Sequence, residues 1–325
     1  MHKMKTRALI PVLLLAGMIS VTACTSGRSS EAEAYRTEGI SAMAQGSYGK
    51  AQDLFAQAME LDADTKTSSG LDNYYYQAIA QFNAQDEDGA IATYGNLIKA
   101  DEKNADAYFL RANVYLSKQD MDAAEADFNR VSQLKAEDLR YQIFIYESYR
   151  KYGQEEKGRA HLQYVLDHGG EDRLACARAK DYLGQTDAAI ADYEAAIRAG
   201  KKEAYGPLIA LLDREQRTEE ADAVLADYKG KKLTAGDYHR LVNIQLKRAS
   251  YEDANADVEK ALSEKKLKET DQRQLLADQV ACLERLCRFD EAKEKAEAYV
   301  KLYPRDGEMI RELELIEYAR RPIRE

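Results

Sequence analysis

Tryptophan is absent from this sequence of 325 residues, and proline, cysteine and histidine each occur only four times. So few cysteines argue against a small domain held together by disulfides. So few histidines, with no third ligand at a recognised metal spacing, predict no metal site. Because phenylalanine is also scarce, the 22 tyrosines must supply most of the large packing side chains.

Positive charge is in deficit as well. The formal net charge is −10, which makes a general nucleic-acid partner a poor expectation. Hydrophobic residues make up 45% of the chain and charged residues 32%. This balance is typical of thin helical layers with much solvated surface.

The stretch from Tyr35 to Asp62 is the unit that the rest of the chain repeats. It predicts two helices, at 35–45 and 48–61, joined at Gly46. On the second helix Ala51, Phe55 and Ala58 recur on one face at i, i+4 and i+7. A single hairpin of this kind cannot bury its apolar face alone, so neighbouring hairpins must cover it.

Seven more units follow. The small residue of each second helix recurs at intervals between 31 and 39 residues, at Ala51, Ala90, Ala124, Gly158, Ala189, Ala221, Ala254 and Ala292. Four residues after each of these anchors stand Phe55, Tyr94, Phe128, Leu162, Tyr193, Leu225, Val258 and Ala296. An acidic residue stands two before the anchor in seven units, where it suits the positive end of a helix: Asp88, Asp122, Glu156, Asp187, Glu219, Glu252 and Asp290.

This pattern resembles the tetratricopeptide repeat, a helix hairpin with a period of 34 residues. The first unit matches its signature at Tyr35, Gly39, Ala51, Phe55 and Ala58. The resemblance implies an all-α fold, a right-handed α-solenoid of about eight hairpins over residues 32–306. Residues 307–325 are then a capping helix and tail, since the end of such a stack needs a solvating helix.

Three features modify the stack. Gly46, Gly153 and Gly184 are expected in turns with positive φ. The polar insertion 64–70 is expected to loosen the first hairpin from the rest. Pro207 is expected in the first turn of a helix.

The first 24 residues are expected to lie outside the fold. Lys3, Lys5 and Arg7 precede a short apolar run, as in a signal peptide. The run ends in Val21-Thr22-Ala23-Cys24, which resembles a bacterial lipobox. That resemblance implies a signal peptide over 1–23, lipidation of Cys24, a flexible tether over 24–31, and a location on the outer side of the membrane. The alternative is a plain secretory signal with an incidental cysteine.

No catalytic constellation is evident, so neither an enzyme nor a cofactor nor a small-molecule substrate is predicted. His161 and His168 lie seven apart but favour surface or interface roles over a metal site. Cys176, Cys282 and Cys287 are predicted to be small apolar fillers, the last two on one helix.

Function in the resembled family resides on the concave face formed by the first helices. The exposed groove positions that this implies are Tyr75, Ile79, Phe82, Asn83, Phe109, Asn113, Leu116 and Ile143. An apolar strip with two amides suits an extended peptide or a helix. The alternative is that several of these side chains pack between neighbouring first helices.

From the fourth unit onward the same positions become charged, at Glu147, Arg150, Lys151, Arg178, Asp181, Asp213, Arg214, Lys247, Glu284 and Arg285. One branch of the family clamps a terminal carboxylate with a lysine and an asparagine. The corresponding pairs here are Phe109/Asn113 and His239/Asn243, which lack the lysine.

These observations favour a lipid-anchored scaffold, without enzymatic activity, that binds a protein or peptide of the cell envelope. The alternative is a structural subunit of an envelope assembly or homo-oligomer, with contacts through the convex face or the cap.

Overall fold

The computed structural model describes residues 27–62, 64, 66–264, 267–304 and 306–319. These residues form seventeen α-helices and the short 3₁₀ helix η2, with no β-strand among them, so the expected all-α fold is confirmed. The chain divides between Glu137 and Asp138 into two compact units.

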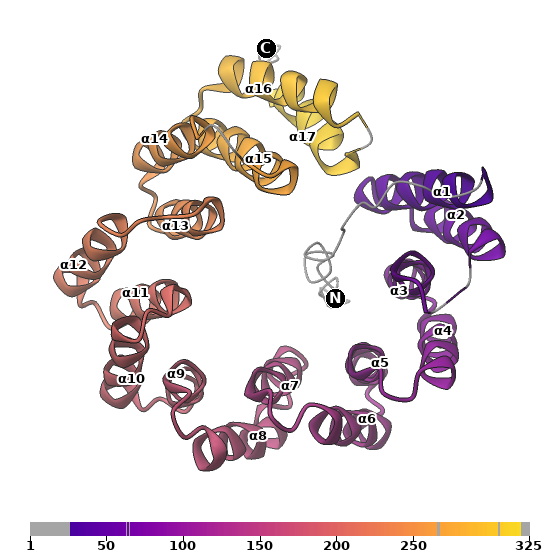
Figure 1. The fold of residues 1–325 in the computed structure, drawn as a ribbon, viewed down its shortest axis with the longest axis horizontal. Helices are drawn as coiled ribbons and strands as arrows, with labels where there is room; N and C mark the ends of the chain where they lie inside the picture. Colours follow the sequence, from indigo (N-terminus) through magenta and orange to yellow (C-terminus); the bar gives the residue numbers. More distant parts are fainter. Residues whose placement is uncertain (1–26, 63, 65, 265–266, 305, 320–325) are drawn as a thin grey trace, which may run out of the picture. The chain divides into compact units, whose positions relative to one another are not determined.

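The first unit holds three helix pairs: α1 (Gly27–Ala44) with α2 (Tyr48–Leu61), α3 (Ser68–Asn83) with α4 (Glu87–Ala100), and α5 (Ala105–Lys118) with α6 (Met121–Leu134). Helices α3 and α5 form one layer of this unit, and α4 and α6 form the other (Figure 1).

The second unit holds five pairs and a final helix. The pairs are α7 (Leu139–Lys151) with α8 (Glu155–His168), α9 (Arg173–Tyr182) with α10 (Thr186–Arg198), α11 (Tyr205–Arg214) with α12 (Thr218–Lys229), α13 (Ala235–Lys247) with α14 (Tyr251–Leu262), and α15 (Glu269–Arg285) with α16 (Phe289–Leu302). Helix η2 (Lys202–Ala204) precedes α11, and α17 (Gly307–Ala319) ends the unit. First helices lie in an inner layer and second helices in an outer one (Figure 1). Pro207 stands in the first turn of α11, as expected.

The small anchor residues explain how closely the helices of a pair approach. All seven alanine anchors have no exposed surface, and Gly158 is buried as well. A Cβ on Gly158 would lie 2.9 Å from Cδ2 of Tyr146, and one on Gly39 would lie 2.6 Å from the Phe55 ring. In six pairs a larger residue four positions later is buried and fills the gap between layers. In the other two the residue is Leu225, which is only partly buried, or Ala296, which is small.

The expected tether at the N-terminal end is wrong in part. Helix α1 begins at Gly27, so residues 27–31 are helical and not part of a flexible tether. Glu31, Ala32 and the residues after them are strong helix formers, and Ala32 is buried. Residues 1–26, which include the expected signal peptide and Cys24, lie outside the described residues.

The insertion 64–70 does not loosen the first hairpin. The Thr67 hydroxyl caps α3 by accepting a hydrogen bond from the Gly70 amide at 3.0 Å. The Asn73 amide group donates to the carbonyl oxygen of Asp62 at 2.8 Å, which ties α3 to the end of α2. The rings of Phe55 and Tyr76 also stack, so α3 packs directly on the first hairpin.

The final helix caps the second unit as expected. Met309 and Ile316 of α17 pack into the apolar cluster formed with α15 and α16. Lys293 of α16 forms an ion pair with Glu317 at 2.9 Å. The outer side of this region is not wholly polar, because Leu315 and Leu302 remain 50% and 59% exposed.

Every hairpin turn has a residue with positive φ, five positions before the anchor. Glycine occupies this position in three pairs, at Gly46, Gly153 and Gly184, as the sequence predicted. In the other five the residues are Gln85, Gln119, Gln216, Ala249 and Cys287, with φ from 56° to 69°. The amide of each turn residue donates to the carbonyl three positions back, and the next amide donates to the carbonyl five back. These bonds satisfy carbonyl groups left free at the end of each first helix.

Cys287 therefore differs from the expectation for it. It lies in a turn after α15 rather than on that helix, and its side chain is exposed. Cys176 and Cys282 are buried, as predicted for apolar fillers.

The turns predict opposite effects for two substitutions. A side chain in the left-handed region costs about 1 kcal/mol, partly offset by the greater freedom of glycine in the unfolded chain. Ala249→Gly is therefore expected to stabilise the protein by up to about 1 kcal/mol. Gly153→Ala is expected to destabilise it by a similar amount, because the added Cβ meets no atom within 4 Å and only the backbone is strained. Thermal unfolding followed by circular dichroism measures both. A lower midpoint for Ala249→Gly would contradict the assignment of strain to this turn.

Candidate functional site

Most of the expected groove residues lie inside the core. Five of the eight are buried, with exposed fractions of 9% or less: Tyr75, Ile79, Asn113, Leu116 and Ile143. Phe82, Asn83 and Phe109 are half-buried. The expectation of an exposed strip is therefore wrong for these five positions. Their side chains pack against neighbouring elements instead, in line with the alternative interpretation.

Local contacts explain this burial. Tyr75 of α3 packs against Tyr94, and its hydroxyl donates to Oδ1 of Asn104 at 2.7 Å. The Asn113 side chain donates to the carbonyl oxygen of Phe109 in its own helix at 2.9 Å, so its amide is already used. In the second unit Ile143 belongs to the cluster between α7, α8 and α9.

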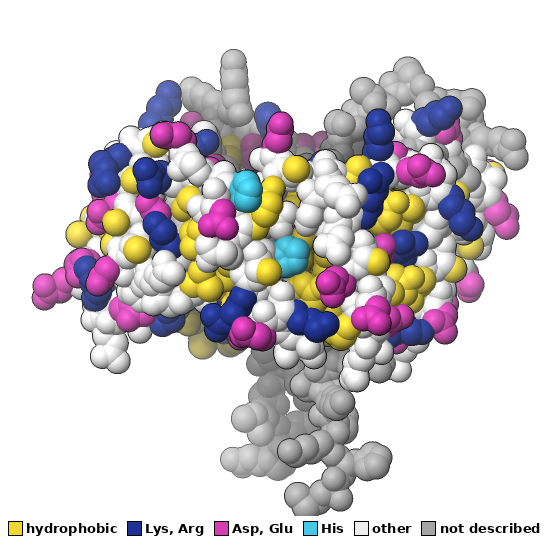
Figure 2. Space-filling model, turned by 90° about the horizontal axis from the view of Figure 1, so that it is seen from below, with side chains coloured by type: hydrophobic (Ala, Val, Ile, Leu, Met, Phe, Trp, Pro, Cys, Tyr) yellow, Lys and Arg dark blue, Asp and Glu magenta, His cyan; other side chains and the backbone are white. Residues whose placement is uncertain are grey.

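The charged positions of the second unit behave as expected. All ten, from Glu147 to Arg285, are exposed or half-exposed. Some of these positions pair between neighbouring first helices, such as Arg214 with Asp181. Figure 2 shows another face, seen from below in Figure 1, where charges of both signs also lie among apolar side chains.

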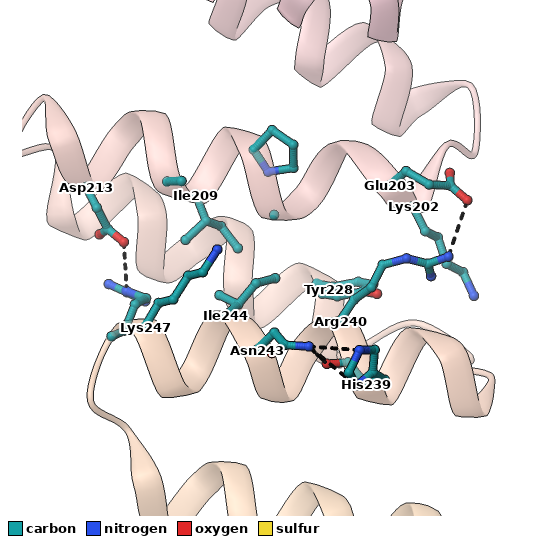
Figure 3. Close-up of a pocket in the computed structure, with 14 residues that line it drawn as sticks. Lys202, Glu203, Ile209, Asp213, Tyr228, His239, Arg240, Asn243, Ile244 and Lys247 are labelled. Atoms are coloured by element: carbon teal, nitrogen blue, oxygen red, sulfur yellow. Dashed lines mark hydrogen bonds and ion pairs between the residues drawn. The ribbon is translucent and has the colours of Figure 1, made fainter. Parts of the chain in front are cut away.

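A hollow of about 370 Å³ lies between the first helices α11 and α13. Its lining residues are Lys202, Glu203, Gly206, Pro207, Ile209, Ala210, Asp213, Tyr228, His239, Arg240, Asn243, Ile244, Lys247 and Arg248. The volume falls at the lower end of the range for ligand pockets. Figure 3 shows the two helices running side by side, with Ile209 and Ile244 facing the space between them. We refer to this space as the α11–α13 hollow.

Polar contacts hold the walls of the α11–α13 hollow in place. His239 Nδ1 lies 2.7 Å from Oδ2 of Asp278, a buried residue of α15. The Asn243 side chain donates to the carbonyl oxygen of His239 at 3.0 Å. At the two ends of the hollow, Arg240 lies 3.6 Å from Glu203 and Arg248 lies 3.1 Å from Asp213 (Figure 3).

The hollow combines residues that the sequence singled out with residues that it did not. Asp213 and Lys247 were among the expected charged positions, and His239 and Asn243 among the compared clamp pairs. Pro207, Ile209 and Ile244 were not predicted to be site residues. The glycine at position 206 was a usable signal in the sequence, because a residue without a side chain leaves space in the wall of the hollow. A Cβ added to Gly206 would fill part of that space and lie 3.6 Å from Cδ1 of Ile244.

The two histidines seven apart do not share a site. His161 Nδ1 lies 2.7 Å from Oε1 of Gln142, and burial lowers the pKa of His161 to about 4. His168 Nδ1 instead lies 2.9 Å from the carbonyl oxygen of Tyr164. Within the described part of the chain no group of three or more His, Cys, Asp or Glu side chains is arranged to hold a metal ion. No described helix combines the length and apolar character needed to cross a bilayer.

The family model named tetratricopeptide repeat matches residues 75–138. Residues 75–138 therefore carry tetratricopeptide repeats, and all eight described helix pairs share a hairpin with a buried small anchor. The predicted fold class is thus confirmed, and proteins of this class are generally scaffolds for protein–protein interaction. No curated protein matches the chain.

Several solved structures are similar to parts of the chain. A tetratricopeptide repeat protein from Parabacteroides merdae has 17% identity and a TM-score of 0.38, covering 77% of this chain and 99% of its own. PilW, described as a widely conserved type IV pilus biogenesis factor, has 18% identity and a TM-score of 0.34, covering 62% and 96%. PilF of Pseudomonas aeruginosa has 14% identity and a TM-score of 0.32, covering 78% and 100%. At these TM-scores the structures do not indicate what this chain binds.

One charged position of the second unit has an unusual environment. Glu284 of α15 is half-buried beside α17, and its carboxyl group shares a hydrogen bond with that of Glu312. Burial, followed by this hydrogen bond, raises the pKa of Glu284 from 4.5 to about 7, while Arg285 opposes the rise. The contact between α15 and the cap therefore favours a protonated Glu284.

This environment predicts a pH-dependent stability. Because the pKa of Glu284 is higher in the folded than in the unfolded chain, its protonated carboxyl group contributes to stability. This contribution is fully present below pH 4.5 and is lost as the pH rises through about 7. Glu284→Gln keeps the hydrogen bond without ionising. It is expected to raise the unfolding midpoint at about pH 8 more than at about pH 5. Glu294→Gln, at an exposed position of α16, is the control and should show no such difference. Equal shifts at both pH values would contradict the interpretation.

Proposed function

We propose that this protein is a lipid-anchored adaptor without enzymatic activity, held on the outer side of a bacterial membrane, and that it binds a segment of a cell-envelope protein in the α11–α13 hollow. The observation that carries the binding proposal is this hollow, an apolar trough with charged ends between two first helices. Peptide segments dock in such places because apolar side chains supply the buried area and polar groups set the orientation.

The anchor is supported by the sequence around Cys24. A positive segment, a short apolar run and Val21-Thr22-Ala23-Cys24 stand in the order of a lipoprotein signal. Lipidation with two or more chains gives stable anchoring, since one chain alone binds a membrane only marginally. The described helices begin at Gly27, so the repeats would lie close to the membrane surface.

The anchor can be tested with Cys24→Ser. The wild-type chain is expected to incorporate labelled palmitate and to fractionate with membranes, and the variant is expected to lose the label and most of the membrane association. Cys287→Ser is the matched control, because it removes a cysteine without touching the lipobox. A wild-type chain that is cleaved but carries no label would instead indicate a plain secretory signal.

Binding in the hollow can be tested by filling it. Ala210 lies on α11, lines the hollow and is exposed, so Ala210→Trp occupies the trough without disturbing the core. Ala298→Trp, at an exposed position of α16, is the control. After crosslinking in intact cells, partners recovered with the wild type and the control are expected to fall about tenfold or more with Ala210→Trp. Unchanged recovery would remove the hollow from the proposal.

The absence of enzymatic activity is part of the proposal. It is supported by the general role of tetratricopeptide-repeat proteins as scaffolds. The perturbed carboxyl group of Glu284 lies against the cap helix and is accounted for by packing, so it does not by itself suggest catalysis.

A structural subunit remains the second candidate because of the exposed apolar side chains near the cap. Leu302 and Leu315 leave much of their surface in water, which suits a contact with another chain. If this candidate is right, light scattering of the chain without its lipid should show an oligomer that Leu315→Lys dissociates. A monomer at all concentrations would disfavour it.

A further inference from the structure

We infer that the α11–α13 hollow is selective for a carboxylate, and that its occupant is a partner segment with an acidic side chain next to an apolar one. This inference deepens the proposed function and rests on it. The charges of the lining, one lining cation without an ion-pair partner among the described residues and the shape of the hollow support it.

The lining is positive although the chain as a whole is negative. Four lining residues are cationic, Lys202, Arg240, Lys247 and Arg248, and two are anionic, Glu203 and Asp213, so the lining carries +2 with histidine neutral. The whole chain carries −10. Asp237 and Asp222, which pair with lining cations, offset this excess, so the attraction of the hollow for an anion is concentrated at the lining cation that has no such partner among the described residues.

Three of the four cations already have partners. Lys202 pairs with Asp237 at 2.7 Å. Arg240 and Arg248 pair with the two anions of the lining, and also with Asp237 and Asp222 respectively. Their charges are therefore largely used in holding the walls together.

Lys247 is different. It forms no ion pair with any of the described residues, and it is the last residue of α13. Figure 3 shows its ammonium group reaching into the hollow beside Ile209 and Ile244. An ammonium group next to an apolar surface is suited to a ligand with a carboxylate at one point and a hydrocarbon group at the next.

The shape of the trough favours an internal side chain over a chain end. Lining residues extend along α11 from Gly206 to Asp213 and along α13 from His239 to Lys247. Ion pairs stand at both ends of the hollow, whereas Ala210, Asn243 and Lys247 of its lining are exposed, so a side chain enters from the open face between the two helices. The small volume admits side chains rather than a folded domain.

The test uses labelled peptide probes of about ten residues and the detergent-solubilised full chain, with affinity measured by fluorescence anisotropy. One probe has a glutamate between two leucines, and its matched probe has glutamine there, both with amidated ends. A third has the neutral core and a free terminal carboxylate. The glutamate probe is expected to bind up to about fivefold more tightly than the glutamine probe, with the difference shrinking at high salt.

Substitution of the lysine supplies the second readout. Lys247→Glu is expected to weaken binding of the glutamate probe about tenfold and to leave the glutamine probe nearly unchanged. Lys301→Glu is the matched control, since Lys301 is also exposed, unpaired and in the last turn of its helix. Equal affinity for the two amidated probes, or no effect of Lys247→Glu, would overturn the inference. Preference for the third probe would overturn the choice of an internal side chain.

The experiments distinguish two claims: that the hollow binds a segment, and that it selects a carboxylate. If Ala210→Trp abolishes binding of all probes while charge has no effect, the hollow binds segments but does not select a carboxylate. If no probe responds to Ala210→Trp, both the selectivity and the binding function of the hollow are wrong.

Discussion

The structure depends on a single backbone conformation that returns in every hairpin. A residue with positive φ ends each first helix, and two backbone hydrogen bonds close the turn behind it. The small anchor of the second helix always follows five positions later, so the turn determines which face of that helix meets its partner. Because the anchor is small, the helices approach closely, and the larger residue four positions on fills the space between layers. Glycine suits this turn, yet five pairs use other residues and retain the same geometry.

The same packing rule explains why the α11–α13 hollow lies where it does. In the first unit, large side chains such as Tyr75 and Ile79 are buried in the apolar clusters around α3. Between α11 and α13 the facing residues include Gly206 and Pro207, which fill less space. The hollow is thus a local deficit of side-chain volume within an otherwise regular stack. Ion pairs at its two ends connect one wall to the other.

The periodicity of the sequence was sufficient to predict the fold class, the eight pairs, the anchors and the start of the cap at Gly307, because these follow from local spacing and helix signals. The periodicity was not sufficient to predict which side chains of the first helices are exposed to solvent. Whether Tyr75 or Ile143 faces a partner or a neighbouring helix depends on how consecutive pairs pack, which spacing alone does not determine. The repeat pattern also does not determine the start of α1 or the end of α15. The first depends on the helix-forming residues upstream of Tyr35, and the second on the turn that places Cys287 beyond the helix.

The position of Cys287 has a practical consequence. Of the three described cysteines, two are enclosed in the core and one stands in an exposed turn between α15 and α16. Among these described cysteines, a maleimide dye should therefore attach at Cys287 without prior mutagenesis. That place adjoins the helix pair on which the cap rests, so the emission of such a dye should report whether the C-terminal end of the stack is closed.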